Sequence, residues 1–252
     1  MPARTASSKT SELLDSVLGA HGGVDRWNRF EEISAVLVTG EGLMPMKGIN
    51  LDPMPLGGTA SIHHESTIIT PFAKPDQRMV FTPERVLVET SSGTIVAERS
   101  NPRETFAGHT LTTPLGHAPE GALQRLCPLD LSQHPFSACN AGFRSRRDCA
   151  LARRKRSLAR IASSLSRYDR DPQQGTGFLF GEDFLLRRHD YNLEIAGGVP
   201  VTQYVFTIVE AEGFHFPSKR RAYVRGPELR PIRDLLLISI DLSNFRLKAA
   251  AS

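Results

Sequence analysis

The strongest constraint on the fold is a series of short segments in which apolar and polar residues alternate, each ended by a turn signal. In the C-terminal part these segments run from Phe184 to Ile195, Val201 to Val209, Phe214 to Val224 and Leu235 to Leu242. Turn residues such as Gly197-Gly198, Glu212-Gly213 and Gly226-Pro227 separate them. A period of two residues is typical of strands, and tight turns join antiparallel neighbours. No helical pattern intervenes, so the sequence predicts a mainly β protein whose antiparallel sheet curls into a barrel or half-barrel.

The N-terminal part begins with a helical pattern and then changes to the strand period. Thr10 or Ser11 can cap a short helix that carries Leu13, Leu14, Val17 and Leu18, and Gly22-Gly23 ends it. A second short turn around Val24 to Phe30 is expected to bury Trp27. Strands are then expected at Ile33 to Thr39, Thr59 to Ile69, Arg85 to Thr90 and Thr94 to Arg99.

Length and composition place the chain among ordinary globular proteins. It has 252 residues, of which 40% are hydrophobic and 23% charged, and no apolar run is long enough for a membrane span. We expect one β-rich domain over residues 10–247, with short tails at 1–9 and 248–252. The first nine residues lack the apolar core of a secretory signal, which favours the cytoplasm.

The stretch from Leu115 to Phe178 breaks the alternating pattern. Between Gly121 and Gly175 it contains eleven Arg or Lys and four Asp, but no Val, Thr or Glu. All three cysteines lie there, at Cys127, Cys139 and Cys149, and their spacings match no zinc or redox signature. The sequence therefore predicts no metal and no cofactor.

Three interpretations of this stretch are open. It can form a basic helix over Cys149 to Leu165, with Arg153 to Arg156 as a phosphate or localisation patch, or a solvated run of charges. The third interpretation is a shifted reading frame, because compatible codons moved by one nucleotide encode an aromatic amphipathic helix and an alternating strand. We favour this third hypothesis, in which the natural segment is a helical lid, since it restores the periodicity and charge balance of both flanks.

Five short motifs resemble those of a family of uncharacterised bacterial proteins of about this length. They are Ala20-His21-Gly22-Gly23-Val24-Asp25-Arg26-Trp27, Val80-Phe81-Thr82-Pro83, Phe106-Ala107-Gly108-His109-Thr110-Leu111, Leu185-Leu186-Arg187-Arg188-His189-Asp190-Tyr191 and Ser239-Ile240-Asp241-Leu242-Ser243. The resemblance covers about residues 10–114 and 179–247, and it implies a LolA-like half-barrel, the cupped sheet of lipoprotein carriers. It implies no reaction and no catalytic residue.

The candidate site residues lie on the strand from Leu185 to Ile195. Arg187, His189 and Tyr191 share one face of that strand. If this face lines the cup, all three side chains point into it. A histidine beside a tyrosine and an arginine can do acid–base chemistry, whereas the alternative is a hydrogen-bonded ladder across strands. His64 likewise shares a face with Ala60, Ile62 and Ile68. Its two alternative roles are a ligand contact and a hydrogen-bonded histidine of the core.

Other polar clusters carry weaker signals. Adjacent residues of a strand face opposite ways, so neither His63-His64 nor His189-Asp190 can chelate one ion together. The nucleophile-elbow, P-loop and dinucleotide motifs are absent from the sequence. The Lys219-Arg220-Arg221 cluster fits a charged strand edge, or alternatively a contact with an anionic ligand.

Three functions are consistent with these patterns. The first is binding of a small lipophilic or amphipathic molecule in a β-cup, with His64, Arg187, His189 and Tyr191 in contact with it. The second is an enzyme in the same cup, with His189 as acid or base, Tyr191 as proton donor and Arg187 positioning an anionic group. Nucleic-acid binding through Arg153 to Arg156 is the third and least favoured.

Overall fold

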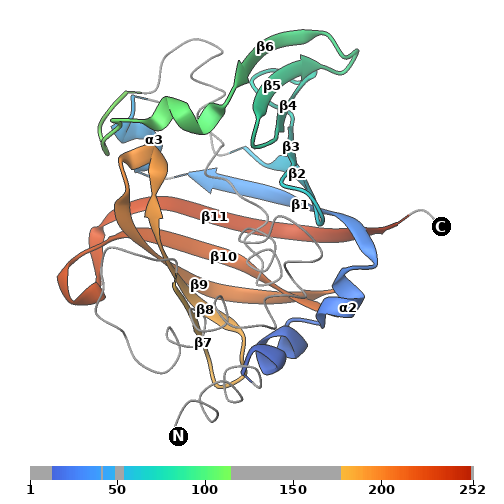
Figure 1. Cartoon of the computed structure of the whole chain (residues 1–252), viewed down its shortest axis with the longest axis vertical. Coiled ribbons are helices and arrows are strands. Elements are labelled where there is room, and N and C mark those ends of the chain that lie inside the picture. The colour runs from blue at the N-terminus through green and yellow to red at the C-terminus, as the bar shows by residue number, and fades with distance from the viewer. Residues whose placement is uncertain (1–12, 41, 49–53, 115–176, 251–252) are drawn as a thin grey trace, which may run out of the picture.

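The fold was established from a computed structural model, which describes residues 13–40, 42–48, 54–114 and 177–250 (Figure 1). The basic run, the three cysteines and nearly all of the stretch with the suspected change of frame lie outside the described residues. Within them the protein is mainly β, as the alternating pattern predicts.

The strands of the described residues form one sheet of eleven, in the order β6-β5-β4-β3-β2-β1-β11-β10-β9-β8-β7. Every neighbouring pair is antiparallel. The strands are β1 (Phe30–Gly40), β2 (Leu56–Ser61), β3 (Thr67–Thr70), β4 (Gln77–Phe81), β5 (Arg85–Thr90), β6 (Ile95–Ser100), β7 (Gly177–Phe180), β8 (Leu186–Leu193), β9 (Val199–Ala211), β10 (Phe214–Arg225) and β11 (Pro231–Ala249). The expected antiparallel, curled sheet is therefore confirmed.

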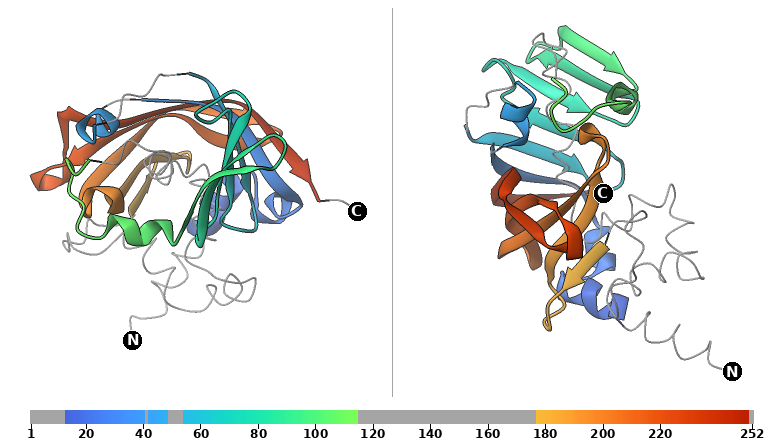
Figure 2. Two further views of the ribbon diagram at one scale, coloured as in Figure 1. Left: turned by 90° about the horizontal axis from the view of Figure 1, so that it is seen from above. Right: turned by 90° about the vertical axis from the view of Figure 1, so that its left-hand side faces the viewer.

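The sheet curls into an open arch, which Figure 2 shows end-on in its left view. Alternation gives the arch two different faces, as in β1, where Ile33, Ala35 and Leu37 are buried and the residues between them are partly exposed. The buried set continues across the sheet register, from Leu37 to Leu242 on β11 and from Ile33 to Ala60 on β2. The apolar face thus forms the inner, concave wall of the arch.

Aromatic packing closes one end of the arch. Residues 13–20 are helical, and α2 (Val24–Trp27) follows them. The Trp27 ring lies 5.4 Å from Phe214 and 6.2 Å from Phe216, and Phe216 stacks on Phe245 at 4.4 Å. This cluster fixes the N-terminal helices against the hairpin of β9 and β10.

The opposite end is closed by three short helical segments, α3 (Leu43–Met46), η1 (Pro102–Phe106) and η2 (Glu194–Ala196). Residues 101–113, which we call the strap, include η1 and cross the open side of the arch (Figure 2, left). Lys47, fully buried beside α3, holds the strap by donating hydrogen bonds to the carbonyls of Thr110 at 2.8 Å and Thr113 at 3.2 Å. Burial lowers the pKa of Lys47.

Three sequence-based expectations are corrected. The segment from Thr59 to Ile69 is not one strand, because β2 ends at Ser61 and β3 begins at Thr67. The Lys219-Arg220-Arg221 cluster is not at an edge, because β10 lies between β9 and β11 inside the sheet. The last strand is longer than the expected Leu235 to Leu242, since it begins at Pro231 and continues to Ala249, paired with β1 through two irregularities of register.

The contact between the strap and η2 depends on Gly197. This residue has φ +72°, and a Cβ atom there would lie 2.1 Å from the carbonyl oxygen of His109. Gly198 has a similar φ of +77°, but no atom lies within 4 Å of its Cβ position. Substitution of Gly198 therefore measures the cost of backbone strain alone, and substitution of Gly197 measures that strain together with a steric clash against the strap.

We expect Gly198→Ala to cost about 1 to 2 kcal/mol of unfolding free energy, since a side chain disfavours the left-handed conformation. Gly197→Ala should cost about 1 to 3 kcal/mol more, because the strap must also move. Urea denaturation of both variants measures the difference. Equal losses would show that the strap does not pack on Gly197.

Candidate functional site

A group of polar side chains interrupts the apolar inner wall near one edge of the sheet. His189 and Tyr191 come from β8, Gln203 from β9 and Arg220 from β10, and we call these four the inner polar cluster. His189 pairs in register with Gln203, Gln203 with Ala222, and Arg220 with Val205. Three of the four are nearly inaccessible, at 5% for His189, 4% for Gln203 and 4% for Arg220.

Aromatic rings hold His189 in place. Its imidazole stacks on Phe178 of β7, with centroids 4.5 Å apart and planes 6° from parallel. The Tyr191 ring is tilted against it by 31°, with centroids 4.8 Å apart. Burial lowers the pKa of His189 to about 4, a shift that the Asp190 charge opposes and the Arg220 charge reinforces. Burial also raises the pKa of Tyr191 to about 12, against the opposing charge of Arg220.

These shifts define the charge state of the cluster near neutral pH. His189 is neutral, Tyr191 keeps its phenolic proton, and Arg220 carries its permanent positive charge. The cluster therefore presents a cation with neutral hydrogen-bonding groups beside it, on a wall that is otherwise apolar. Such an arrangement suits the polar end of an amphipathic molecule.

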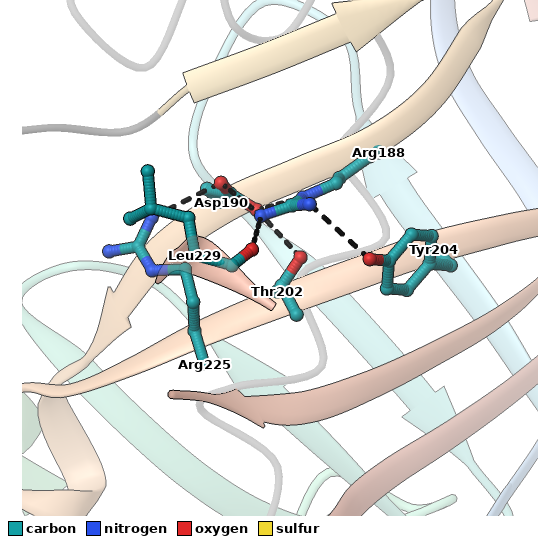
Figure 3. Close-up of polar contacts among 6 residues, drawn as sticks. All are labelled: Arg188, Asp190, Thr202, Tyr204, Arg225 and Leu229. Atoms are coloured by element: carbon teal, nitrogen blue, oxygen red, sulfur yellow. Dashed lines mark hydrogen bonds and ion pairs between the residues drawn. The ribbon is translucent and has the colours of Figure 1, made fainter. Parts of the chain in front are cut away.

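The outer face of the same strands carries a different polar group (Figure 3). The Asp190 carboxylate accepts hydrogen bonds from Arg188 at 2.7 and 2.9 Å and from the Thr202 hydroxyl at 2.7 Å, and it pairs with Arg225 at 3.2 Å. Arg188 also donates to the carbonyl of Leu229 at 2.6 Å. These bonds fasten the connection between β10 and β11 to the back of β8.

The charge of Asp190 is maintained by its partners. Burial alone would raise the pKa of this carboxyl, but hydrogen bonds from Arg188 and Thr202, with the charges of Arg188 and Arg225, outweigh burial and lower it. The guanidinium of Arg188 also lies over the ring of Tyr204, 5.4 Å from its centroid. This outer group is a structural clamp whose members satisfy one another.

The residues expected from the sequence fall into two sets. His189 and Tyr191 lie side by side on the inner wall. Arg187 starts on the same strand face, but its half-exposed side chain forms an ion pair with Asp183 in the turn before β8. His64 lies exposed in the turn between β2 and β3, so the expected core-facing position is wrong. His63 is exposed in the same turn.

His21 is a polar residue whose role the sequence did not reveal. It is fully buried, its Nδ1 donates to the Val17 carbonyl at 2.8 Å, and its Nε2 accepts the Leu186 amide at 3.4 Å. Those partners fix the tautomer, and burial lowers the pKa of this histidine. The next residue, Gly22, has φ +115° and leaves no room for a Cβ atom against Phe214. The His-Gly-Gly motif thus joins the N-terminal helix to the sheet.

No cluster of three or more His, Cys, Asp or Glu among the described residues is arranged to hold a metal ion. None of their helices has the length and apolar character needed to cross a membrane.

The described residues therefore define a mainly β protein, built from one curled antiparallel sheet with an apolar inner wall and a small polar cluster on it. No protein-family model matches the chain, and no curated protein matches it in sequence.

Two solved structures are similar in fold. A LolA superfamily protein from Nitrosomonas europaea is 9% identical with a TM-score of 0.42, over 96% of this chain and 94% of that one. A DUF1329 family protein from Desulfovibrio piger is 10% identical with a TM-score of 0.43, over 96% and 95%. At these values neither structure brings a function to this chain.

The buried histidine makes stability depend on pH. The unfolded chain protonates His189 near pH 6.5 and the folded chain near 4, so stability falls as the pH drops through this window. The loss amounts to about 3 kcal/mol at most. His21, whose pKa is also lowered, adds to the loss in the same direction.

We therefore expect His189→Phe, which keeps the stacked ring, to flatten the acid limb of the stability curve by about that amount. Urea denaturation between pH 7 and 4 measures it, with His64→Gln in the exposed turn as the control. An acid limb of unchanged slope in His189→Phe would contradict the assigned burial.

The outer clamp gives a second test. Asp190→Asn leaves two largely buried guanidinium groups without their carboxylate and should cost about 3 kcal/mol. Asp241→Asn removes a half-exposed partner of Arg221 on the same face, and should cost about 1 kcal/mol or less. Similar values for both variants in urea denaturation would show that the clamp is not a buried network.

Proposed function

We propose that the protein binds a small lipophilic or amphipathic molecule against the inner wall of the arch. The observation that carries this proposal is the largely apolar inner wall that spans the sheet from β5 to β9. Its members include Val88, Met79, Ile69, Ala60, Ile33, Leu37, Leu242, Ile240, Ile238, Ala222 and Val201, each less than 9% exposed. A concave apolar surface with a few polar groups at one place is the usual composition of a small-molecule site.

The inner polar cluster supports an amphipathic ligand over a purely apolar one. It lies at the β8 side of the wall, so a ligand with its polar end there would direct its apolar part across β10, β11 and β1. We propose His189 and Tyr191, which lie side by side on the inner wall, as contacts of the polar end of the ligand. Arg187 and His64, whose side chains are exposed elsewhere, are not among these contacts.

Acid–base catalysis in the same place is less well supported. A histidine of pKa about 4 has no proton to give near neutral pH and is a weak base. A phenol of pKa about 12 does not ionise there. Nucleic-acid binding would depend on Arg153 to Arg156, which lie outside the described residues.

A neutral fluorescent probe, N-phenyl-1-naphthylamine, tests the proposal. Its emission should rise saturably on binding to the full chain. Val205, half-buried on the inner wall, and Phe206, 59% exposed on the outer face, are adjacent on β9. Val205→Asn should weaken probe binding about tenfold, because it puts an amide on the apolar wall, whereas Phe206→Asn should leave binding unchanged.

Circular dichroism of both variants checks that the sheet is intact. A parent protein that gives no saturable signal would contradict the proposed function. Equal weakening by both variants would place the probe elsewhere than on the inner wall.

A further inference from the structure

We infer that the polar end of the ligand is an uncharged group that both donates and accepts hydrogen bonds, such as a hydroxyl or a carboxamide, and that Gln203 and Tyr191 bind it. This inference depends on the proposed binding function and names the chemical class of the ligand. Gln203 lies on β9 and Tyr191 on β8, which are neighbouring strands of the sheet.

The sheet register brings these two side chains together on the inner wall. Gln203 pairs with His189 and Tyr191 pairs with Val201, so Gln203 and Tyr191 are diagonal neighbours on one face. Diagonal neighbours in antiparallel strands have Cα atoms about 7 to 8 Å apart, a distance that long side chains can bridge. One small head group of a ligand can therefore contact both residues.

Both side chains lack a hydrogen-bond partner within the part of the chain that the structure describes. Gln203 is only 4% exposed, and its amide forms no hydrogen bond there. The Tyr191 hydroxyl has none either, and the influences on its pKa are burial and the charge of Arg220. Native proteins pair nearly all buried polar groups, because an unpaired group loses its hydrogen bonds to water without compensation. A ligand that pairs with both groups explains why they are there.

The pair offers hydrogen bonds in both directions and carries no charge. The Gln203 amide has an acceptor oxygen and an NH₂ donor, and the Tyr191 phenol has a donor and an acceptor. A hydroxyl or carboxamide of the ligand donates to the Gln203 oxygen and accepts from the Tyr191 hydroxyl. A carboxylate has no proton to donate, and it would bring a net charge onto a largely apolar wall.

The other two members of the inner polar cluster do not change this balance. His189 and Arg220 each have an interaction partner of their own in the protein. Burial keeps His189 neutral near pH 7 by lowering its pKa to about 4. Burial also raises the pKa of Tyr191 to about 12, so the phenol keeps the proton that it donates. An anionic head group would therefore meet no unpaired cation among the four residues of the cluster.

Tyr191 is the member of the cluster with accessible surface. It is partly exposed, whereas His189, Gln203 and Arg220 are nearly inaccessible. Its ring also packs against the apolar core of the arch. The head group therefore reaches the pair beside Tyr191, and the apolar part of the ligand stays on the wall.

Competition against bound N-phenyl-1-naphthylamine compares head groups on one chain length. Decanol carries a hydroxyl, and 1-chlorodecane replaces it by an atom that donates no hydrogen bond. We call the dissociation constant of 1-chlorodecane divided by that of decanol the hydroxyl preference. Gln203→Met and Tyr191→Phe should each lower the hydroxyl preference about threefold to tenfold, because each removes one hydrogen bond to the hydroxyl.

Two matched variants serve as controls. Tyr223→Phe removes a phenol from the outer face of β10, where the Tyr223 ring meets Tyr204. Phe206→Met changes an exposed side chain on the outer face of β9, the strand of Gln203. Both should keep the hydroxyl preference of the parent. Charged head groups complete the comparison: near neutral pH the parent should bind decanol and decanamide about tenfold more tightly than decanoate or decylamine.

The stability of the ligand-free protein gives a readout that does not depend on binding. Gln203→Met replaces an unpaired amide by an apolar side chain of similar length, so the urea midpoint should be unchanged or higher. A lower midpoint, or a variant that does not fold, would show that the amide has a partner within the protein and would overturn the inference.

The outcomes separate the two claims. An unchanged hydroxyl preference in Gln203→Met or in Tyr191→Phe would overturn the inference and leave the proposed function standing; water bound to the pair in place of a ligand group would give this result. Tighter binding of decanoate than of decanol would overturn the uncharged head group in the same way. A parent that binds neither the probe nor decanol would overturn the proposed function itself.

Discussion

The pairing of β1 with β11 is the contact on which the rest of the structure depends. It joins the first six strands to the last five, so that two meanders become one sheet. The register runs from Phe30 opposite Ala249 to Gly40 opposite Ser239. An irregularity between Ser34 and Val36, opposite the positive φ of Asn244, adds local twist. Because strands far apart in sequence form this ladder, the inner wall exists only when the whole chain has folded.

Because side chains alternate between the two faces of the central strands, the same strands contribute to the outer clamp and to the inner wall. On β8, Asp190 projects outward into the clamp with Arg188, and its neighbour His189 projects inward against Phe178. On β10, Lys219 faces out and Arg220 faces in. The outer charges are mutually satisfied and rigidify the strands, and that rigidity fixes the positions of the inner polar groups.

Much of the sheet could be predicted from the sequence because strand period and turn chemistry are local signals. The shared face of His189 and Tyr191 follows from the same period. The position of His64 could not be predicted in this way, because the turn that interrupts Thr59 to Ile69 contains no glycine or proline, and the residues before and after it continue the alternation. The order of the strands could not be predicted either, so the Lys219-Arg220-Arg221 cluster of an interior strand was interpreted as part of an edge strand.

The polar residues that hold the ends of the arch depend on contacts between distant segments. Lys47 binds carbonyls of the strap more than sixty residues away, and His21 accepts an amide of β8. Neither contact produces a periodic pattern in the sequence, since each is made by one side chain with backbone groups. The inward orientation of Arg220 could not be predicted for a related reason. Its neighbours Lys219 and Arg221 are also cations, and they point to the outer face.

The central claim is that the inner wall, and not the outer face, receives the ligand. Methyl NMR spectra of isoleucine-labelled protein, recorded during titration with decanol, test this most directly. Ile33, Ile69, Ile238 and Ile240 lie on the inner wall, and Ile68 and Ile208 lie on the outer face. Shifts concentrated on the inner methyl groups are the predicted result. Shifts confined to Ile68 and Ile208, or spread evenly over both faces, would contradict the account.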